Sequence, residues 1–426
     1  MNAVLRSAIA RALSFLPTAV ATLLTSRLII QHYGILTFDA FALVLTLISL
    51  IPLNNLGVGA AVTTTYAAEG PESEHSRRVT LTAARTLAVS SVGTAAVVVG
   101  LTAIHAWPSL LGVASGPNKY TGLAALVFAL SFLPGLGQSM LLGVHRNHVV
   151  VISQTFFTPL ILLGTVGVIG FGVTGDAVML GPPISLVIIN ILTCALATRS
   201  TGISWRWLLR ALPWRRRYPG ASIRGMSGPV LLITLATPIA LQSDRLVLSH
   251  VSTTQAVADY SVVMQIFAPA IALIAASAQP LWPIYAAARA EGRSGPSLPK
   301  MLLLFGGAGA LCGALLALVA NPVASLIGGD QIHLGWLLPL AGALAVVTAA
   351  LSYPVAMSLM DPSGVRLIAT LTLVALPLNI GLSIIFARHW GAAGPLFASV
   401  LVGILVQTLP GVFFGPNGRS GGRHRA

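Results

Sequence analysis

The sequence predicts an all-α integral membrane protein of about twelve transmembrane helices, arranged as two six-helix halves. Hydrophobic residues make up 55% of the 426 residues and charged residues only 8%, far below the share usual in soluble proteins. Mean hydropathy is +0.87. Many apolar runs reach about 18 residues, the length of one helical bilayer crossing. These runs do not alternate between apolar and polar residues, which excludes the strands of a membrane barrel.

The expected spans follow one another along the whole chain. Several of their ends are marked by turn-forming pairs such as Gly116-Pro117 and Gly295-Pro296. The predicted spans are about 10–32, 38–62, 80–105, 120–143, 149–172, 177–198, 227–250, 257–281, 301–326, 332–359, 366–387 and 392–414.

The first span has some features of a secretory signal peptide. Arg6 and Arg11 precede an apolar run, and Ala19-Val20-Ala21 has the form of a cleavage site. The apolar run continues to Ile30, however, so the segment is long enough to cross the membrane. We therefore interpret it as an uncleaved first helix.

The basic residues predict the orientation in the membrane. With the N-terminus in the cytoplasm, all of the 24 Lys and Arg residues except Arg27, Lys119, Arg245 and Arg388 fall on the cytoplasmic side. This positive-inside bias predicts an even number of spans and two cytoplasmic termini. It also explains the pI of about 11.1 by membrane topology, so nucleic acid is not expected as a partner.

A basic insert divides the chain into residues 1–198, a cytoplasmic linker over 199–225 and residues 226–426. The linker carries seven arginines, together with Trp205, Trp207 and Trp214. It has the composition of a segment that lies on anionic membrane lipids, with its tryptophans at the interface. A docking site for a partner enzyme is the alternative.

The two halves share a short sequence pattern that indicates an internal repeat. Residues 26–32, SRLIIQH, match residues 244–250, DRLVLSH. Six predicted spans separate the two copies, and an even number preserves the direction of the chain. A parallel repeat about an axis along the membrane normal is a transporter architecture, with the substrate path between the halves.

The charged residues of this pattern are the main candidates for substrate contact. Arg27 and Arg245 lie near the periplasmic ends of their helices, where their side chains could also snorkel to the interface. Facing a cavity, they would form a cationic site suited to phosphate oxygens. Asp244 either neutralises Arg245 or is an acid that couples transport to protons. Buried acids are otherwise scarce, which favours an anionic or polar substrate over a cationic drug.

Amide side chains within the spans could contact a hydroxyl-rich substrate in the same cavity, although a hydrogen bond between helices is the ordinary role of such residues. The amide candidates are Asn54, Asn55, Gln242 and Gln265.

Patterns typical of enzymes are absent from the sequence. It has no nucleotide-binding GxxxxGK(S/T) loop, no GxSxG turn and no paired-carboxylate site. His145 and His148 have no third ligand nearby, so no metal site is expected. We therefore expect a non-enzymatic protein without a cofactor. Coupling to H+ or Na+ is open, as is the need for an ion gradient.

Three segments carry a resemblance to a known family. Residues 17–62 resemble the first two helices of Wzx-type polysaccharide and O-antigen flippases, a branch of the multidrug/oligosaccharidyl-lipid/polysaccharide exporter superfamily. Residues 243–265 are similar to the seventh helix and the entry to the eighth in that family. Residues 377–403 are similar to its eleventh helix, short turn and final helix. The resemblance runs over nearly the whole chain.

This resemblance implies a MATE-like architecture in a bacterial inner membrane. It implies export of undecaprenyl-pyrophosphate-linked oligosaccharides from the cytoplasmic to the periplasmic leaflet by alternating access, for surface polysaccharide biosynthesis. A polysaccharide polymerase and glycosyltransferases would be partners, and Arg27 and Arg245 would face the pyrophosphate or acidic sugars. Two other hypotheses remain open: a multidrug antiporter of the same superfamily, and a non-transporting scaffold for glycosyltransferases.

Overall fold

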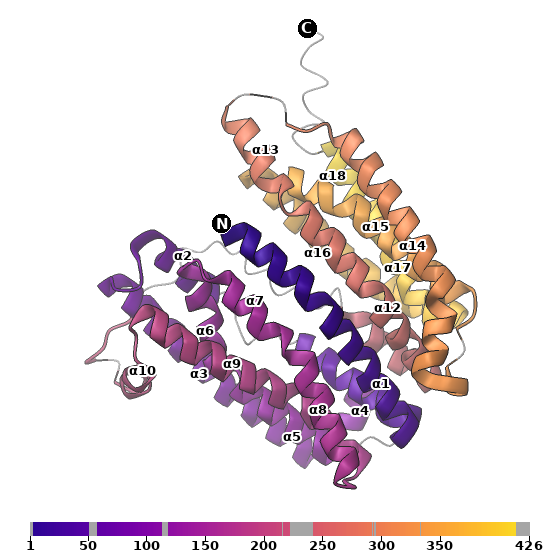
Figure 1. Cartoon of the computed structure of the whole chain (residues 1–426), viewed down its shortest axis with the longest axis horizontal. Coiled ribbons are helices and arrows are strands. Elements are labelled where there is room, and N and C mark those ends of the chain that lie inside the picture. Colours follow the sequence, from indigo (N-terminus) through magenta and orange to yellow (C-terminus); the bar gives the residue numbers. More distant parts are fainter. Residues whose placement is uncertain are drawn as a thin grey trace. The chain divides into compact units, whose positions relative to one another are not determined.

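The computed structural model consists of helices joined by turns over its described residues, which are 3–50, 58–112, 118–214, 216–221, 242–291, 293, 295–332 and 334–414 (Figure 1). Within these ranges it has no strand. In the part of the chain that the structure describes, eight helices, or nine with one bent pair, are long and apolar enough to cross a membrane. The predicted all-α membrane fold class is confirmed.

The chain forms two compact units, residues 1–238 and 239–426. In the N-terminal unit, α1 packs against α7 and α8, and α9 packs against α5, α6 and α8. The elements of this unit are α1 (Ala3–Leu50), α2 (Val58–Glu69), α3 (Glu74–Ala103), α4 (Trp107–Leu111), α5 (Asn118–Leu130), α6 (Phe132–Gly143), α7 (Asn147–Thr155), α8 (Phe157–Gly170), the 3-10 helix η2 (Gly175–Leu180), α9 (Gly181–Thr201) and α10 (Trp205–Ala211).

In the C-terminal unit, α15 packs against α12, α14 and α17, and α16 packs against α17. Residues 242–251 are helical, and the last span contains a π-helix, η5. The elements after residue 251 are α12 (Thr254–Ala278), α13 (Leu281–Ala290), α14 (Leu298–Gly328), η3 (Gly329–Gln331), α15 (Leu337–Ser358), α16 (Pro362–Trp390), η4 (Gly391–Ala393), α17 (Gly394–Val402), η5 (Gly403–Thr408) and α18 (Leu409–Phe414).

Two glycines mark turns between predicted spans. Gly34, with φ 81°, interrupts α1 between the predicted spans 10–32 and 38–62. Gly391, with φ 54°, separates α16 from α17, close to the predicted boundary between the last two spans. Both residues occupy a region of backbone conformation that side chains with a Cβ disfavour. The predicted span 227–250 lies mostly outside the described residues.

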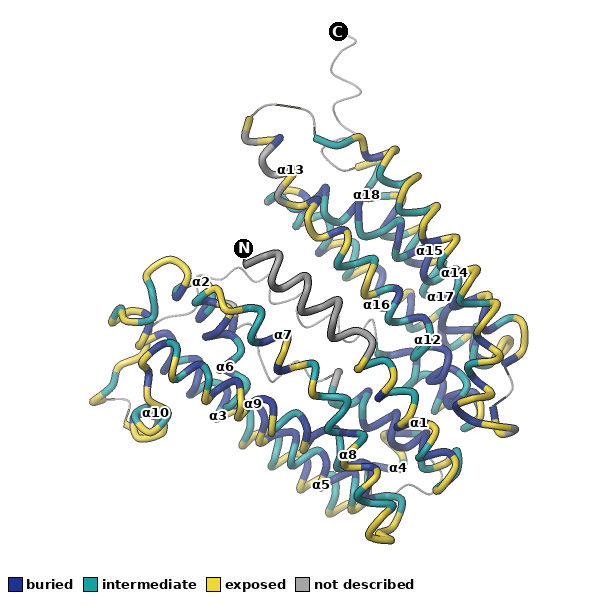
Figure 2. Tube along the Cα trace, in the orientation of Figure 1, coloured by how far each residue is buried: buried dark blue, intermediate teal, exposed yellow. Residues whose placement is uncertain are grey.

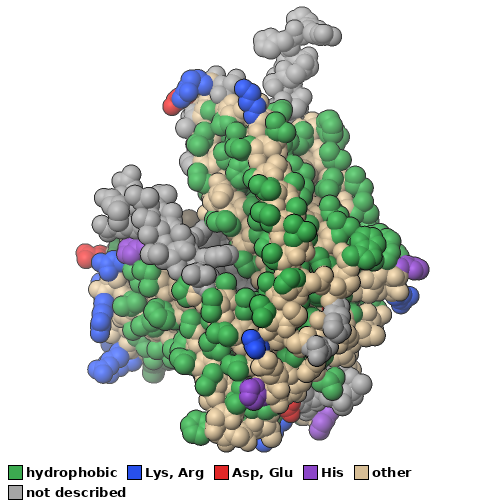
Figure 3. Space-filling view, turned by 45° about the vertical axis from the view of Figure 1, so that its right-hand side comes forward, with side chains coloured by type: hydrophobic (Ala, Val, Ile, Leu, Met, Phe, Trp, Pro, Cys, Tyr) green, Lys and Arg blue, Asp and Glu red, His purple; other side chains and the backbone are tan. Residues whose placement is uncertain are grey.

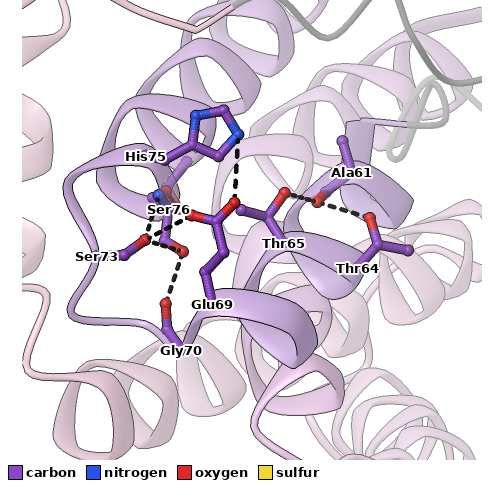
Figure 4. A network of polar contacts seen from close by, with 9 residues as sticks. Ala61, Thr64, Thr65, Glu69, Gly70, Ser73, His75 and Ser76 are labelled. Carbon is purple, nitrogen blue, oxygen red and sulfur yellow. Dashed lines mark hydrogen bonds and ion pairs between the residues drawn. The ribbon is translucent and has the colours of Figure 1, made fainter.

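The turn between α2 and α3 is closed by polar contacts (Figure 4). Ser73 is the N-cap of α3, and its hydroxyl accepts a hydrogen bond from the Ser76 backbone N–H at 3.0 Å. The Ser76 hydroxyl donates to the Gly70 carbonyl at 2.6 Å, while His75 lies 4.0 Å from the Glu69 carboxylate. The two serine contacts satisfy backbone groups at the helix ends that have no intrahelical partner.

Large apolar side chains lie on the outside of the helices, as expected for contact with lipid. On α14, Leu303 and Leu318 are 80% and 76% exposed. In the space-filling view, hydrophobic side chains cover much of the visible surface, whereas most Lys and Arg side chains lie toward its edges (Figure 3). The buried residues concentrate on the sides of helices that face other helices (Figure 2).

Close packing of α14 against α15 depends on small residues. A Cβ added to Gly313 would lie 2.9 Å from the Ala343 carbonyl oxygen and 3.2 Å from its Cα. A Cβ at Gly309 would lie 2.5 Å from the Ala350 Cβ. This is the close helix approach that the spacing of Gly309 and Gly313 indicates.

Candidate functional site

A buried carboxylate lies in the C-terminal unit, at Asp244 in the helical segment 242–251. The Asp244 side chain is 4% exposed and accepts three hydrogen bonds from hydroxyl groups. Tyr260 on α12 donates to Oδ2 at 3.1 Å, and Ser399 on α17 donates to the same oxygen at 3.3 Å. Ser383 on α16 donates to Oδ1 at 3.4 Å. Four helical segments of one unit therefore meet at this carboxylate.

Asn379 on α16 extends the arrangement. Its Oδ1 lies 3.2 Å from the Ser399 hydroxyl, and the side chain is 6% exposed. Asn379 and Ser383 lie four residues apart and so occupy the same face of α16. We call Asp244, Tyr260, Asn379, Ser383 and Ser399 the Asp244 cluster.

Two acceptor oxygens of the Asp244 cluster compete for the hydrogen of one hydroxyl group. The Ser399 hydroxyl has a single hydrogen, yet acceptor oxygens of both Asp244 and Asn379 lie within its reach. A proton on Asp244, or a small cation between the oxygens, would relieve this competition. The cluster offers carboxylate, amide and hydroxyl oxygens, which are the ligands of hard cations. A carboxylate buried within a membrane bundle is itself costly, and such groups commonly mark ion or proton pathways.

Arg245 is adjacent to Asp244 but belongs to a different face of the helix, since successive residues differ by about 100°. Its side chain is half-buried, and it is close enough to interact electrostatically with Asp244. The Asp244 oxygens nevertheless take their hydrogen bonds from three hydroxyls. Asp244 thus has hydrogen-bonding partners other than its neighbouring arginine.

The remaining predicted site residues are dispersed. Gln242 is half-buried on the helical segment that carries Asp244, and Gln265 is half-buried on α12, the helix that carries Tyr260. Arg27 is exposed on α1, in the other unit. Asn54 and Asn55 lie outside the described residues. Contact of these side chains with a substrate stays a prediction.

The two copies of the repeated pattern share a local contact. Nδ1 of His32 lies 3.0 Å from the Leu28 carbonyl oxygen, and Nδ1 of His250 lies 2.7 Å from that of Leu246. The aligned residues differ at the position of Asp244, where the N-terminal copy has Ser26, which is also buried. The carboxylate is thus specific to the C-terminal copy of the pattern.

A chain of amide groups crosses the N-terminal unit next to a helix break. Gln154 donates to Gln138 at 3.0 Å, Gln138 donates to Asn190 at 2.7 Å, and Asn190 donates to the Ser131 carbonyl at 3.0 Å. Ser131 lies where α5 and α6 meet at a bend of 41°. A break of this kind frees backbone groups, and here the Asn190 amide supplies a partner inside the bundle.

Solved structures of other proteins resemble this chain, whereas comparisons of its sequence found no match. No protein-family model and no curated protein matches the chain. A multidrug resistance MATE family transporter of the MOP superfamily, in an inward-facing conformation, is similar with a TM-score of 0.65 and 16% identity, over 99% of this chain and 100% of the other. The chain shares its fold with transporters.

Two further structures are similar. The lipid II flippase MurJ, in an inward closed conformation, gives a TM-score of 0.68 and 14% identity, over 95% of this chain and 87% of the other. A MOP superfamily transporter from Pyrococcus furiosus gives 0.57 and 17%, over 98% and 95%. These likenesses agree with the predicted MATE-like architecture of the fold. The likenesses concern the fold alone, and they do not identify a substrate.

Proposed function

We propose that this protein is a cation-coupled flippase that moves lipid-linked oligosaccharides, carried on undecaprenyl pyrophosphate, from the cytoplasmic to the periplasmic leaflet of a bacterial inner membrane. The observation that carries the coupling is the buried Asp244 carboxylate and its hydroxyl and amide neighbours. The substrate class is supported by the resemblance of three segments to polysaccharide flippases and by the scarcity of buried acids.

Binding of H+ or Na+ at Asp244 would act on the positions of helices. The cluster joins the segment 242–251 to α12, α16 and α17 through single side chains. A cation held among these oxygens favours the conformation in which they are close together, and its release favours conformations in which they separate. A ligand shifts a conformational equilibrium only through such a difference in affinity.

The adjacency of Asp244 and Arg245 provides a way to link cation and substrate. An ionised Asp244 partly offsets the charge of Arg245, whereas a protonated or cation-bound Asp244 does not. Cation binding would therefore strengthen the attraction of Arg245 for a pyrophosphate group. Because coupling between two binding sites is reciprocal, bound pyrophosphate would equally strengthen cation binding.

A second candidate function is export of multiple drugs by cation antiport. The structural likeness to a multidrug resistance MATE family transporter favours it, and so does the buried carboxylate, which could accept an organic cation. Drug resistance in cells that express the chain, without restored surface polysaccharide, would identify this activity. A scaffold role makes a different prediction. Deletion of the linker would abolish function, and the Arg245→Ala variant would keep it.

The proposal is tested with the purified full chain in proteoliposomes that contain fluorescent undecaprenyl-pyrophosphate-linked oligosaccharide. Transfer between leaflets is measured under an imposed H+ or Na+ gradient, with membranes lacking the protein as the reference. The proposal expects protein-dependent transfer that accelerates with one of the gradients. Absence of transfer under every gradient, from protein that remains folded, would refute it.

A further inference from the structure

The first part of the basic linker is a fixed element of the N-terminal unit. Arg85 on α3 donates hydrogen bonds to the carbonyl oxygens of Ala211 at 2.8 Å, Leu212 at 3.0 Å and Tyr218 at 2.9 Å. On α10, Leu208 and Ala211 are buried in the apolar core of the unit. The outward face of α10 therefore has a defined orientation.

That outward face combines positive charge with exposed apolar groups. Arg206 and Arg210 are exposed, and Leu209 between them is 45% exposed. Trp214, after the helix, is 64% exposed. The sequence contains no Asp or Glu between Asp176 and Asp244. Arginine beside exposed Leu and Trp is the composition of a surface that lies in the headgroup region of a membrane.

A shallow hollow of about 390 Å³, wide open to the surface, lies where α9 ends and α10 begins. It exists because Gly202, with φ 68°, ends α9 in the left-handed conformation and allows the chain to return toward α10. Arg199, in the last turn of α9, and Arg206, in the first turn of α10, both line it. Its other lining residues are Thr198, Gly202, Ser204 and Trp205.

The lining suits a phosphate group. Two guanidinium groups can each offer paired N–H donors to phosphate oxygens, and the Ser204 hydroxyl adds a further donor. Trp205 supplies an aromatic surface of the kind found at the level of lipid headgroups. The hollow adjoins the end of a membrane span, where lipid phosphates are concentrated. Leu209, three residues after Arg206 and so on the same side of α10, is 45% exposed.

We propose that this hollow binds the phosphate of an anionic membrane lipid, and we call it the α9–α10 lipid site. The occupant is a headgroup of the surrounding bilayer rather than free phosphate, because the exposed Leu209, on the same side of α10 as Arg206, provides an apolar contact for an acyl chain. The site would hold the linker on the membrane surface in every step of transport. It stands independently of the identity of the transported substrate.

The test measures lipid binding to the full chain in neutral detergent by native mass spectrometry. Phosphatidylglycerol and phosphatidylcholine are titrated in parallel against the wild-type protein and three variants. R199Q/R206Q removes both guanidinium groups from the site, and R199K/R206K keeps the charge but removes the paired donors. R216Q/R217Q removes the same charge from exposed positions of the linker that do not line the hollow.

The wild type is expected to retain phosphatidylglycerol in preference to phosphatidylcholine. R199Q/R206Q should lose about tenfold or more in affinity for phosphatidylglycerol, since each arginine near a membrane surface contributes about fivefold. R199K/R206K should lose part of this affinity, and R216Q/R217Q should stay within about twofold of wild type. A thermal melt of each variant in detergent establishes that it is folded.

Three results would overturn the proposal. Equal losses in R199Q/R206Q and R216Q/R217Q would mean that only general charge matters. Full affinity in R199K/R206K would exclude the paired-donor geometry. Displacement of phosphatidylglycerol by an equal concentration of inorganic phosphate would assign the hollow to free phosphate instead of a lipid.

Discussion

Asp244→Asn is the substitution that addresses coupling most directly. It removes the ionisable group at the centre of the Asp244 cluster while keeping nearly the same shape. Asp244 is the buried carboxylate of the described part of the C-terminal unit, so we expect one monovalent cation per transport cycle. One charge moving through roughly 100 mV releases about 2.3 kcal/mol, which corresponds to a concentration ratio of about 50-fold. The variant should lose this driven accumulation and retain only passive equilibration.

The fold should tolerate this change. Asparagine keeps one oxygen acceptor, and the Ser399 hydroxyl can donate to Asn379 instead. Removing a buried charge also offsets part of the lost hydrogen bonding. We expect the free energy of unfolding to change by less than about 2 kcal/mol. Lost coupling can therefore be separated from lost protein.

The assay compares final substrate distribution in proteoliposomes with and without an imposed gradient. Asp259→Asn is the matched control, because Asp259 is a half-buried acid on the same helix as Tyr260, and it pairs with Gln255 at 2.8 Å. Asp259→Asn should retain gradient-driven accumulation. If Asp244→Asn accumulates substrate as well as wild type under the same gradient, the assignment of Asp244 is wrong.

Three further predictions concern other parts of the chain. Arg27→Ala and Arg245→Ala should each impair export of a surface polysaccharide without loss of protein from the membrane, and full export by the double variant would contradict a cationic substrate site. Gly313→Leu should destabilise the protein by about 1–3 kcal/mol in a detergent unfolding measurement, because the α15 backbone lies against this position. Gly307→Leu is the control on the same helix. Its side chain enters open space, so this variant should change the stability little. Arg85→Ala removes three hydrogen bonds to linker carbonyls, so limited proteolysis should cut within 202–221 faster than in wild type. Unchanged cleavage would mean that the apolar contacts alone hold the linker.

The membrane fold could be predicted from the sequence because each span carries its own signal. A helix in lipid satisfies its backbone hydrogen bonds within itself, so its apolar length shows in the local sequence. Asp244 was identifiable for a related reason, since a carboxylate in an apolar run is rare enough to be noticed. The predicted boundary between the spans 10–32 and 38–62 likewise falls where Gly34 interrupts α1.

The partners of Asp244 were not predictable in the same way. Ser383 and Ser399 lie 139 and 155 residues further along the chain, and serine is too common in membrane helices to attract attention. Tyr260 is only 16 residues away and lies in the segment 243–265 that also carries Asp244, but its hydroxyl contact depends on helix packing. Asn379 was one amide among several, and only its position opposite Ser399 distinguishes it.

The π-helix η5 has a mechanical consequence for the last span. It begins at Gly403, four residues after Ser399, and Thr408 within it contacts both the Gly403 carbonyl at 2.8 Å and Ser352 of α15 at 2.7 Å. A π turn holds one residue more than an α turn, so conversion between the two rotates the adjoining segment by about 100°. Twisting at the Ser399 end of the span can be absorbed at this wide turn while Thr408 remains anchored to α15. We therefore expect the end of the last span to keep its position against α15 when helices move at the Asp244 cluster.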